Sequence, residues 1–136
     1  MTCPLCTLPA GELLYEDARL WVLLVDEAGY PGFCRVIWKQ HVREMSDLAA
    51  ADSSHLLDWV LRTEKAIRHV MQPDKINLAS LGNVVPHLHW HVIPRFADDA
   101  HFPSPIWASP QRSGTDHGKA GLADGLRAAL KNQPLA

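Results

Sequence analysis

Histidines alternate with apolar residues over a short stretch, and this pattern constrains the fold more than any other feature of the chain. The stretch reads His87-Leu88-His89-Trp90-His91-Val92-Ile93. Strict alternation is the period of a half-buried β-strand, in which every second side chain lies on the same face. The pattern predicts a strand that ends near Pro94. Its three imidazoles would line one face, and the intervening apolar side chains would pack behind them.

Three imidazoles on one surface support two kinds of chemistry. Imidazole is the side chain whose unperturbed pKa lies nearest physiological pH. The histidines could bind a metal ion as a His-x-His set. Alternatively, one of them could attack a substrate as a nucleophile while its neighbours handle charge and protons. The residues alone leave both alternatives open, and they favour either one over three unrelated structural histidines.

The remaining segments predict a single α+β domain over residues 1–136. β-forming residues predict strands at 13–16, 20–26, 34–39 and 75–80. An amphipathic pattern predicts one long helix, capped by Asp52 or Ser53 and ending near Met71 before Pro73. A short terminal helix is predicted at 122–131. Because only one long helix separates strands that are otherwise joined by short links, we expect an antiparallel sheet.

Motif-bearing residues are confined to the first part of the chain. Residues 1–95 form the predicted core, and residues 96–136 form a C-terminal extension rich in Pro, Ser and Gly between 103 and 118. This extension carries no recognisable motif, so the sequence assigns it no role.

Charge and cysteine content restrict the partners and the compartment. The formal net charge of −2 does not predict duplex nucleic-acid binding, which needs a strongly basic surface. No apolar run reaches membrane-spanning length, and the first residues lack the features of a signal peptide. Three cysteines argue against a disulfide framework. We therefore expect a cytoplasmic protein that acts on a small molecule, with no duplex nucleic acid or membrane as partner.

The histidine motif, written His-φ-His-φ-His-φ-φ with φ apolar, resembles the signature of the histidine triad (HIT) family. Residues 82–86 are similar to the family's Gly-Gln-x-Val-x lead-in, with Asn83 in the place of Gln. Residues 31–41 resemble its second landmark, and residues 3–6 resemble the Cys-x-x-Cys of many bacterial members. The resemblance covers about residues 3–95. It implies a HIT-like α+β fold with a five-stranded antiparallel sheet, one long helix and a short terminal helix, and usually a homodimer.

The resemblance also implies an activity. Family members are nucleotidyl hydrolases or transferases that act at the α-phosphate of a nucleoside phosphate derivative. The nucleophile role falls on His89, which would form a nucleotidyl-histidine intermediate that water hydrolyses. His91 would donate to the phosphate oxygens, and His87 would anchor the site. Asn83 would contact the leaving-group side, with a shorter reach than the family's Gln.

Further ligands follow from the same resemblance. Asp26 falls where the family places a ribose-contacting residue, and Asn77 on a neighbouring strand is a second candidate for substrate binding. As in zinc-bearing members, a structural zinc would be held by the set Cys3, Cys6, His41 and His87. The chemistry itself would require no cofactor.

Several functions stay open at this point. A hydrolase of dinucleoside polyphosphate-type substrates is favoured. A nucleoside phosphoramidase of the same family is the nearest alternative. A metal-dependent hydrolase using the three histidines as ligands, and a nucleotide-binding protein without catalysis, come from other classes.

Overall fold

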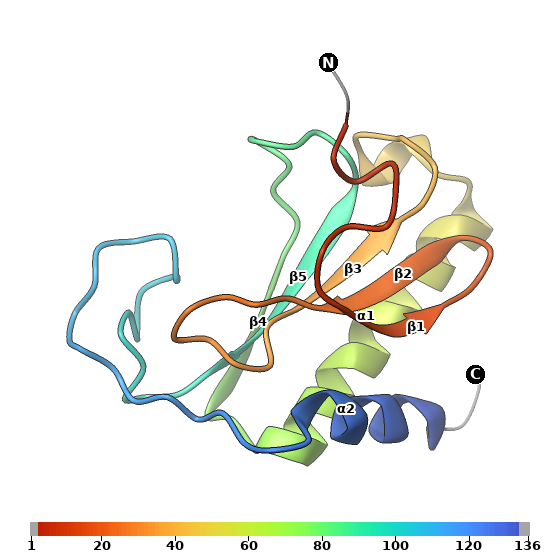
Figure 1. Ribbon diagram of the computed structural model, residues 1–136. Helices are drawn as coiled ribbons and strands as arrows, with labels where there is room; N and C mark the ends of the chain where they lie inside the picture. Colours follow the sequence, from red (N-terminus) through yellow and green to blue (C-terminus); the bar gives the residue numbers. More distant parts are fainter. Residues whose placement is uncertain (1–2, 134–136) are drawn as a thin grey trace.

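Five strands form one antiparallel sheet in the computed structural model, which describes residues 3–133 (Figure 1). The spatial order is β1-β2-β3-β5-β4, and every neighbouring pair is antiparallel. The strands are β1 (Glu12–Glu16), β2 (Leu20–Leu24), β3 (Cys34–Trp38), β4 (Lys75–Ala79) and β5 (His89–Arg95). The predicted α+β class and the five-stranded antiparallel sheet are confirmed.

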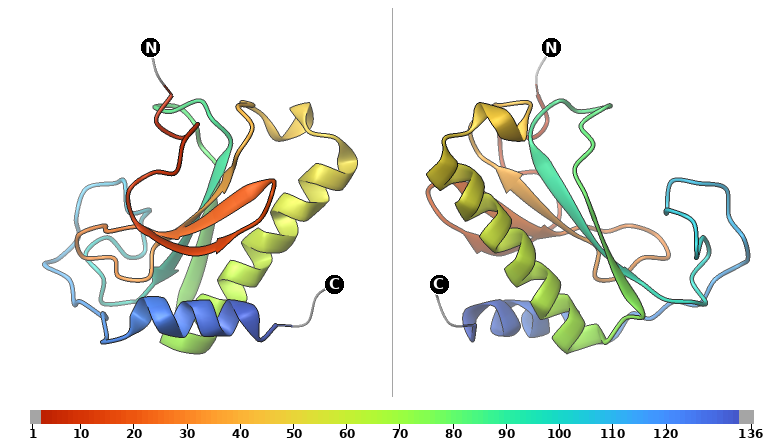
Figure 2. Two further views of the ribbon diagram at one scale, coloured as in Figure 1. Left: turned by 45° about the vertical axis from the view of Figure 1, so that its right-hand side comes forward. Right: turned by 180° about the vertical axis from the view of Figure 1, so that it is seen from behind.

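One long helix covers a single face of this sheet (Figure 2). This helix is α1 (Ala50–Met71), and it follows the short 3₁₀ helix η1 (Met45–Asp47). The terminal helix α2 (Leu122–Lys131) packs against α1 and β1. Both predicted helices are therefore confirmed.

The start of α1 differs from the prediction. The helix begins three residues earlier than a cap at Asp52 allows, with Ala49 as the N-cap and no side-chain capping bond. Asp52 instead accepts a hydrogen bond from Arg19 at 3.0 Å, between Oδ1 and Nη1. The predicted end is correct: Gln72 adopts the left-handed conformation with φ 51° directly after Met71.

The two faces of β5 have separate roles. Val92 and Trp90 lie on the face beneath α1, where they join the main hydrophobic core with Leu56 and Ile67. The opposite face carries the odd-numbered residues, among them His89 and His91. Because the period-2 pattern sorts apolar and imidazole side chains onto opposite faces, the histidines are held by a strand that is itself anchored in the core.

Two smaller clusters cover the histidine-bearing face. One joins Leu5 of the N-terminal segment to residues of β2 and β3, namely Trp21, Leu23 and Ile37. The other contains Tyr30, Phe33 and Ile93. Gly32 makes the close approach between the 25–33 loop and α1 possible, because its φ is +86° and an added Cβ would collide with Met71.

The C-terminal extension is ordered by a buried ion pair. Residues 96–118 form a long loop beside the 25–33 loop (Figure 2), as the contacts between Tyr30 and Asp99 show. Arg95 and Asp99 are 2% and 3% exposed, and Nε lies 2.8 Å from Oδ2. Within residues 3–133, no helix is both long enough and apolar enough to cross a membrane.

Candidate active site

The strand that carries the site begins at His89 rather than at His87. Residues 83–87 form bends, and the backbone N–H of His87 donates to the carbonyl of Val85 at 2.8 Å. Pro86, which has no N–H, is the central residue of this turn. The prediction that one strand carries all three histidines is therefore wrong for His87, which precedes the strand. Its imidazole contacts Cys3, which packs against the cluster of Leu5 and Ile37. His89 and His91 remain together, with ring centroids 4.9 Å apart.

A backbone carbonyl sets the tautomer of His89. Its Nδ1 lies 2.6 Å from the carbonyl oxygen of His87. A carbonyl oxygen only accepts hydrogen bonds, so Nδ1 must carry the proton and Nε2 must carry the lone pair. Burial lowers the pKa of His89, the carbonyl contact opposes this, and the charge of Arg35 lowers it further. The result is a neutral imidazole with a nucleophilic nitrogen.

His91 is enclosed by aromatic rings. Its ring meets Phe33 at 5.6 Å and Trp107 at 5.2 Å between centroids, both edge to face. Burial, followed by the charges of His89 and Arg35, lowers the pKa of His91 to about 4. At neutral pH it is therefore an uncharged imidazole with one N–H to donate. Its buried Nδ1 has no partner within the described residues.

Arg35 is a member of this site that the sequence analysis did not identify. It is the antiparallel partner of His91, and it lies between the buried residues Cys34 and Val36 of β3. Its Nε is buried and has no hydrogen-bond partner among residues 3–133. Burial lowers the pKa of Arg35, and the carboxylate of Glu27 opposes that effect. A charged residue that alternates with apolar residues in a strand is ordinarily expected to be exposed to solvent. Only the pairing of β3 with β5 shows that Arg35 belongs to the site.

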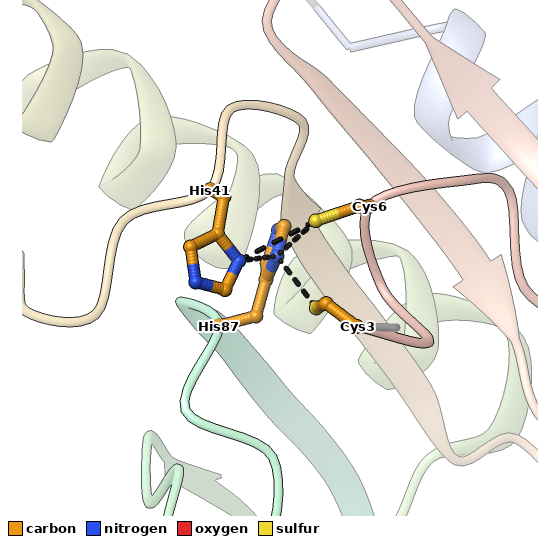
Figure 3. A group of neighbouring side chains, drawn as sticks. All are labelled: Cys3, Cys6, His41 and His87. Atoms are coloured by element: carbon orange, nitrogen blue, oxygen red, sulfur yellow. Dashed lines mark hydrogen bonds between the residues drawn. The ribbon is translucent and has the colours of Figure 1, made fainter. Parts of the chain in front are cut away.

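A second cluster collects the four predicted metal ligands (Figure 3). Cys3, Cys6, His41 and His87 each offer one ligand atom, and these atoms all lie within 4.8 Å of one another. The Nδ1 of His87 is 3.3 Å from the sulfur of Cys3 and 3.1 Å from the Nδ1 of His41. A tetrahedral zinc ion with bonds of about 2.0–2.3 Å separates its ligand atoms by roughly 3.3–3.8 Å. The four side chains could therefore hold a metal ion.

The tautomer of His87 suits this role. Its Nε2 lies 2.5 Å from the carbonyl oxygen of Trp38, so Nε2 carries the proton and Nδ1 presents its lone pair to the cluster. Burial lowers the pKa of His87, the carbonyl opposes this, and His41 lowers it further. A neutral imidazole is the form that binds a metal.

The predicted substrate-binding residues lie in three different environments. Asp26 is exposed beyond the end of β2, and Asn83 is exposed in the loop before His87. Asn77 is half-buried in β4, and its Oδ1 accepts a hydrogen bond from Arg95 at 2.7 Å. The roles proposed for all three remain predictions. Asn77 has a structural partner that the sequence did not reveal.

A cleft opens beside the nucleophile. It measures about 230 Å³ and lies between the segment at 43–45 and the segment at 80–82, with His87, Leu88, His89 and Trp90 in its wall. Near the cleft, Ser80 donates to the backbone carbonyl of His89 at 2.8 Å. The loop residues 81–82 therefore border this cleft.

Trp107 is the second site member that the sequence did not identify. Its side chain is 51% exposed although its ring contacts His91. The neighbouring Ile106 packs against the cluster of Tyr30, Phe33 and Ile93. The long-range anchoring of residues 96–118 brings this indole to the histidines, and no local sequence pattern signals such a contact.

The sequence of the chain matches a known protein family over most of its length. A family model described as "HIT domain" matches residues 10–98. These residues include β1 to β5 and both histidines of the strand.

Two curated proteins are similar to the chain over much of its length. One is named "AP-4-A phosphorylase", from Mycobacterium tuberculosis, with 31% identity over 98 residues, covering 68% of this chain and 47% of that protein. Another is named "Bis(5'-nucleosyl)-tetraphosphatase [asymmetrical]", from Schizosaccharomyces pombe, with 27% identity over 93 residues, covering 64% of this chain and 51% of that protein. The chain thus spans about half the length of these curated relatives.

A solved structure shares the fold over most of its length. It is a histidine triad protein from Marinobacter aquaeolei VT8, with a TM-score of 0.74 and 27% identity, covering 88% of each chain. Because 88% of the 136 residues is more than the first 98 residues of the chain, the similarity includes part of the C-terminal extension beyond the matched family region.

Proposed function

The chain belongs to the HIT domain family, and from this premise we propose that it cleaves a nucleoside phosphate derivative of the dinucleoside polyphosphate type at the α-phosphate. The observation that carries the proposal is the 2.6 Å contact between Nδ1 of His89 and the carbonyl of His87, because it leaves Nε2 free to attack. The two curated relatives, whose names refer to AP-4-A and to a bis(5'-nucleosyl)-tetraphosphate, support the substrate class.

The first step is attack by His89. Its Nε2 forms a bond to the α-phosphorus, and the bond from phosphorus to the leaving-group oxygen breaks. The leaving group departs with the electron pair of that bond and takes up a proton from solvent. A covalent nucleotidyl-histidine remains, with the positive charge of the ring offset by the carbonyl of His87, which accepts from Nδ1 at 2.6 Å.

The second step is hydrolysis of that intermediate. Water attacks phosphorus and releases a proton to solvent, the bond to Nε2 breaks, and the electron pair of that bond returns to the imidazole as a nucleoside monophosphate leaves. His91, uncharged because its pKa is lowered to about 4, donates its N–H to a non-bridging oxygen in both steps. Asn83 borders the leaving-group side, and Asp26 is the candidate for the ribose hydroxyls.

We assign a structural zinc ion to Cys3, Cys6, His41 and His87. A Cys₂His₂ set with all four ligands supplied by the protein is closed, which is typical of structural rather than catalytic zinc. The ion would fix the N-terminal segment to the turn at His87, whose carbonyl orients His89. His89 and His91 belong to no comparable ligand group within residues 3–133, so the geometry disfavours a metal-dependent hydrolase built on the three histidines.

The expected oligomeric state, cellular location and domain organisation remain predictions. A homodimer and a cytoplasmic location are predictions from the family resemblance and from cysteine usage. A single domain over residues 1–136 also stays a prediction, which rests on the length of the chain and its predicted segments. Phosphoramidate cleavage by the same two steps is the second candidate, since the nucleophile and the hydrolysis step would be shared.

Turnover of diadenosine tetraphosphate by a His89→Ala variant tests the proposal. The variant should lose at least about a thousandfold in kcat, because no other group supplies the nucleophile. A His69→Ala variant, changed on the surface of α1, is the matched control and should keep full activity. If His89→Ala retained the activity of the control, the covalent mechanism would be wrong.

A further inference from the structure

A cation whose buried Nε has no hydrogen-bond partner among residues 3–133 lies opposite His91 of the site. Four arginines form ion pairs within residues 3–133, namely Arg19, Arg62, Arg95 and Arg127. Arg35 is not among them, and its buried Nε has no hydrogen-bond partner in the same range. A buried N–H group without an acceptor is costly. Such a group indicates a site that a ligand anion completes.

The strand register places Arg35 against the reacting residues. It is directly opposite His91 on the neighbouring strand, and Ile37 is opposite His89. Directly opposite residues have Cβ atoms about 4.5–5.5 Å apart, and diagonal neighbours about 7–8 Å, within reach of a long side chain. The guanidinium also lies 5.7 Å from the ring centroid of Phe33, whose ring contacts His91. Arg35 therefore shares the surface on which phosphorus is attacked.

Charge balance suggests which substrate needs this arginine. His89 attacks with the lone pair of its Nε2, because the carbonyl of His87 accepts from its Nδ1, so this imidazole brings no positive charge to the phosphates. A phosphoramidate presents one anionic phosphate and leaves as an amine. A dinucleoside polyphosphate presents several anionic phosphates, and its leaving group carries charge away from the attacked phosphorus. Arginine is suited to this task because its planar fork binds phosphate oxygens through two parallel hydrogen bonds.

We propose that Arg35 binds the phosphate chain of the substrate beyond the attacked phosphorus, and that it thereby makes the site selective for phosphoanhydrides over phosphoramidates. This inference rests on the proposed function. It assigns a substrate-binding role to a residue outside the histidine motif, and it chooses between the two substrate classes that the motif leaves open.

Two substitutions test the role of the positive charge. Arg35→Met keeps an apolar stem of similar length and removes the guanidinium, while Arg35→Lys keeps a charge but loses the fork. The matched control is Arg19→Met. Arg19 is 44% exposed, and it forms an ion pair with Asp52, which is not part of β5. Replacing a half-buried cation that has an unpartnered Nε by an apolar side chain should leave the fold intact, so the melting temperature of Arg35→Met should not fall below that of the control.

The kinetic readout compares two substrates with one nucleotide in common. For diadenosine tetraphosphate, kcat/KM of Arg35→Met should fall by about tenfold to a hundredfold, the usual effect of losing a hydrogen bond to a charged group. For adenosine 5'-phosphoramidate it should fall by less than about threefold, and Arg35→Lys should lie between. Equal losses on both substrates would contradict the inference, since Arg35 would then act at the phosphate that both share. No loss on either would contradict it as well.

Binding of inorganic tripolyphosphate separates this inference from the proposed function. Calorimetric titration should show binding to the wild-type protein and to Arg19→Met, and at least tenfold weaker binding to Arg35→Met. This result needs no turnover, so it would support Arg35 as a polyphosphate ligand even if the wild-type protein cleaved neither nucleotide. Equal affinity in all three proteins would refute the role of Arg35, even if cleavage through His89 were demonstrated.

Discussion

Replacing Asp99 by Ala should unfold the loop that carries Trp107. The Asp99 carboxylate receives two hydrogen bonds from Arg95, at 2.8 Å from Nε and 3.1 Å from Nη2. It also receives the backbone N–H groups of Phe96, His101 and Phe102, at 3.1, 3.0 and 2.8 Å. Burial raises the pKa of this carboxyl group, but the hydrogen bonds from Arg95 and the backbone N–H groups outweigh that effect and hold the pKa well below its usual range. One carboxylate therefore organises the turn from β5 into the extension.

The size of the effect follows from what the substitution leaves behind. Arg95 is 2% exposed, so removal of its partner strands a buried charge. Breaking a buried pair in this way costs about 3–5 kcal/mol in the free energy of unfolding. For a chain of this length, that loss corresponds to a melting temperature roughly 10–20 °C lower. Replacing both residues by apolar ones would not recover the whole loss, because the three backbone N–H groups would still lack an acceptor.

Urea denaturation monitored by circular dichroism measures this change, and Asp98→Ala is the matched control. Asp98 is the neighbouring carboxylate, 56% exposed, with His117 as its partner at 2.7 Å. Its removal should shift the denaturation midpoint only slightly, because exposed pairs contribute little. If the midpoint of Asp99→Ala matched that of Asp98→Ala, Asp99 would not be the group that holds the extension.

Three further predictions concern the remaining parts of the account. Gly32→Ala should lower the free energy of unfolding by about 2–4 kcal/mol, because of backbone strain and a collision with Met71. Gly29→Ala is the control for strain alone, since Gly29 has φ +80° and open space around it. Equal losses for the two variants in chemical denaturation would contradict the collision. Cys3→Ser should weaken zinc affinity in a chelator competition by at least about a hundredfold, whereas the buried Cys34→Ala should not; unchanged affinity in Cys3→Ser would exclude Cys3 as a ligand. His91, which faces His89 and Arg35, has a pKa of about 4 in the folded protein and about 6.5 in the unfolded chain. Between these pH values the unfolded chain binds one more proton than the folded protein. The free energy of unfolding should therefore fall as the pH is lowered from 6.5 to 4. At about 1.4 kcal/mol per pH unit, the loss of stability from His91 amounts to roughly 3 kcal/mol. It is measured as the change, across that pH range, in the difference in unfolding free energy between wild type and His91→Gln. A difference that stays constant with pH would contradict the prediction.

The sequence predicted those parts of the molecule that local patterns encode. Alternation around His89 and His91 identified the strand and the face that carries the chemistry. The amphipathic stretch that ends at Met71 identified α1 and its end, although its start was wrong. There the chain uses Ala49 as N-cap, and Asp52 is engaged by Arg19. Propensity for capping could not anticipate a partner that lies 33 residues away in sequence.

Other parts depend on contacts that no local pattern contains. A period of two suggested that His87 belongs to the same strand as His89, but the strand begins only at His89. The turn at Pro86 and the carbonyl of Trp38 orient the imidazole of His87 toward the cysteines. Arg35 becomes a site residue only through its register with His91. Trp107 reaches the site because a buried carboxylate folds back a segment that has neither period nor motif.

Mapping of the covalent intermediate tests the central claim most directly. The protein is mixed briefly with diadenosine tetraphosphate, quenched without acid, digested and examined by tandem mass spectrometry. The account predicts a mass increase of one nucleoside monophosphate group on the peptide that contains His89, localised to that residue and absent from His89→Ala. Full turnover with the adduct on another residue, or turnover by His89→Ala at the wild-type rate, would contradict it.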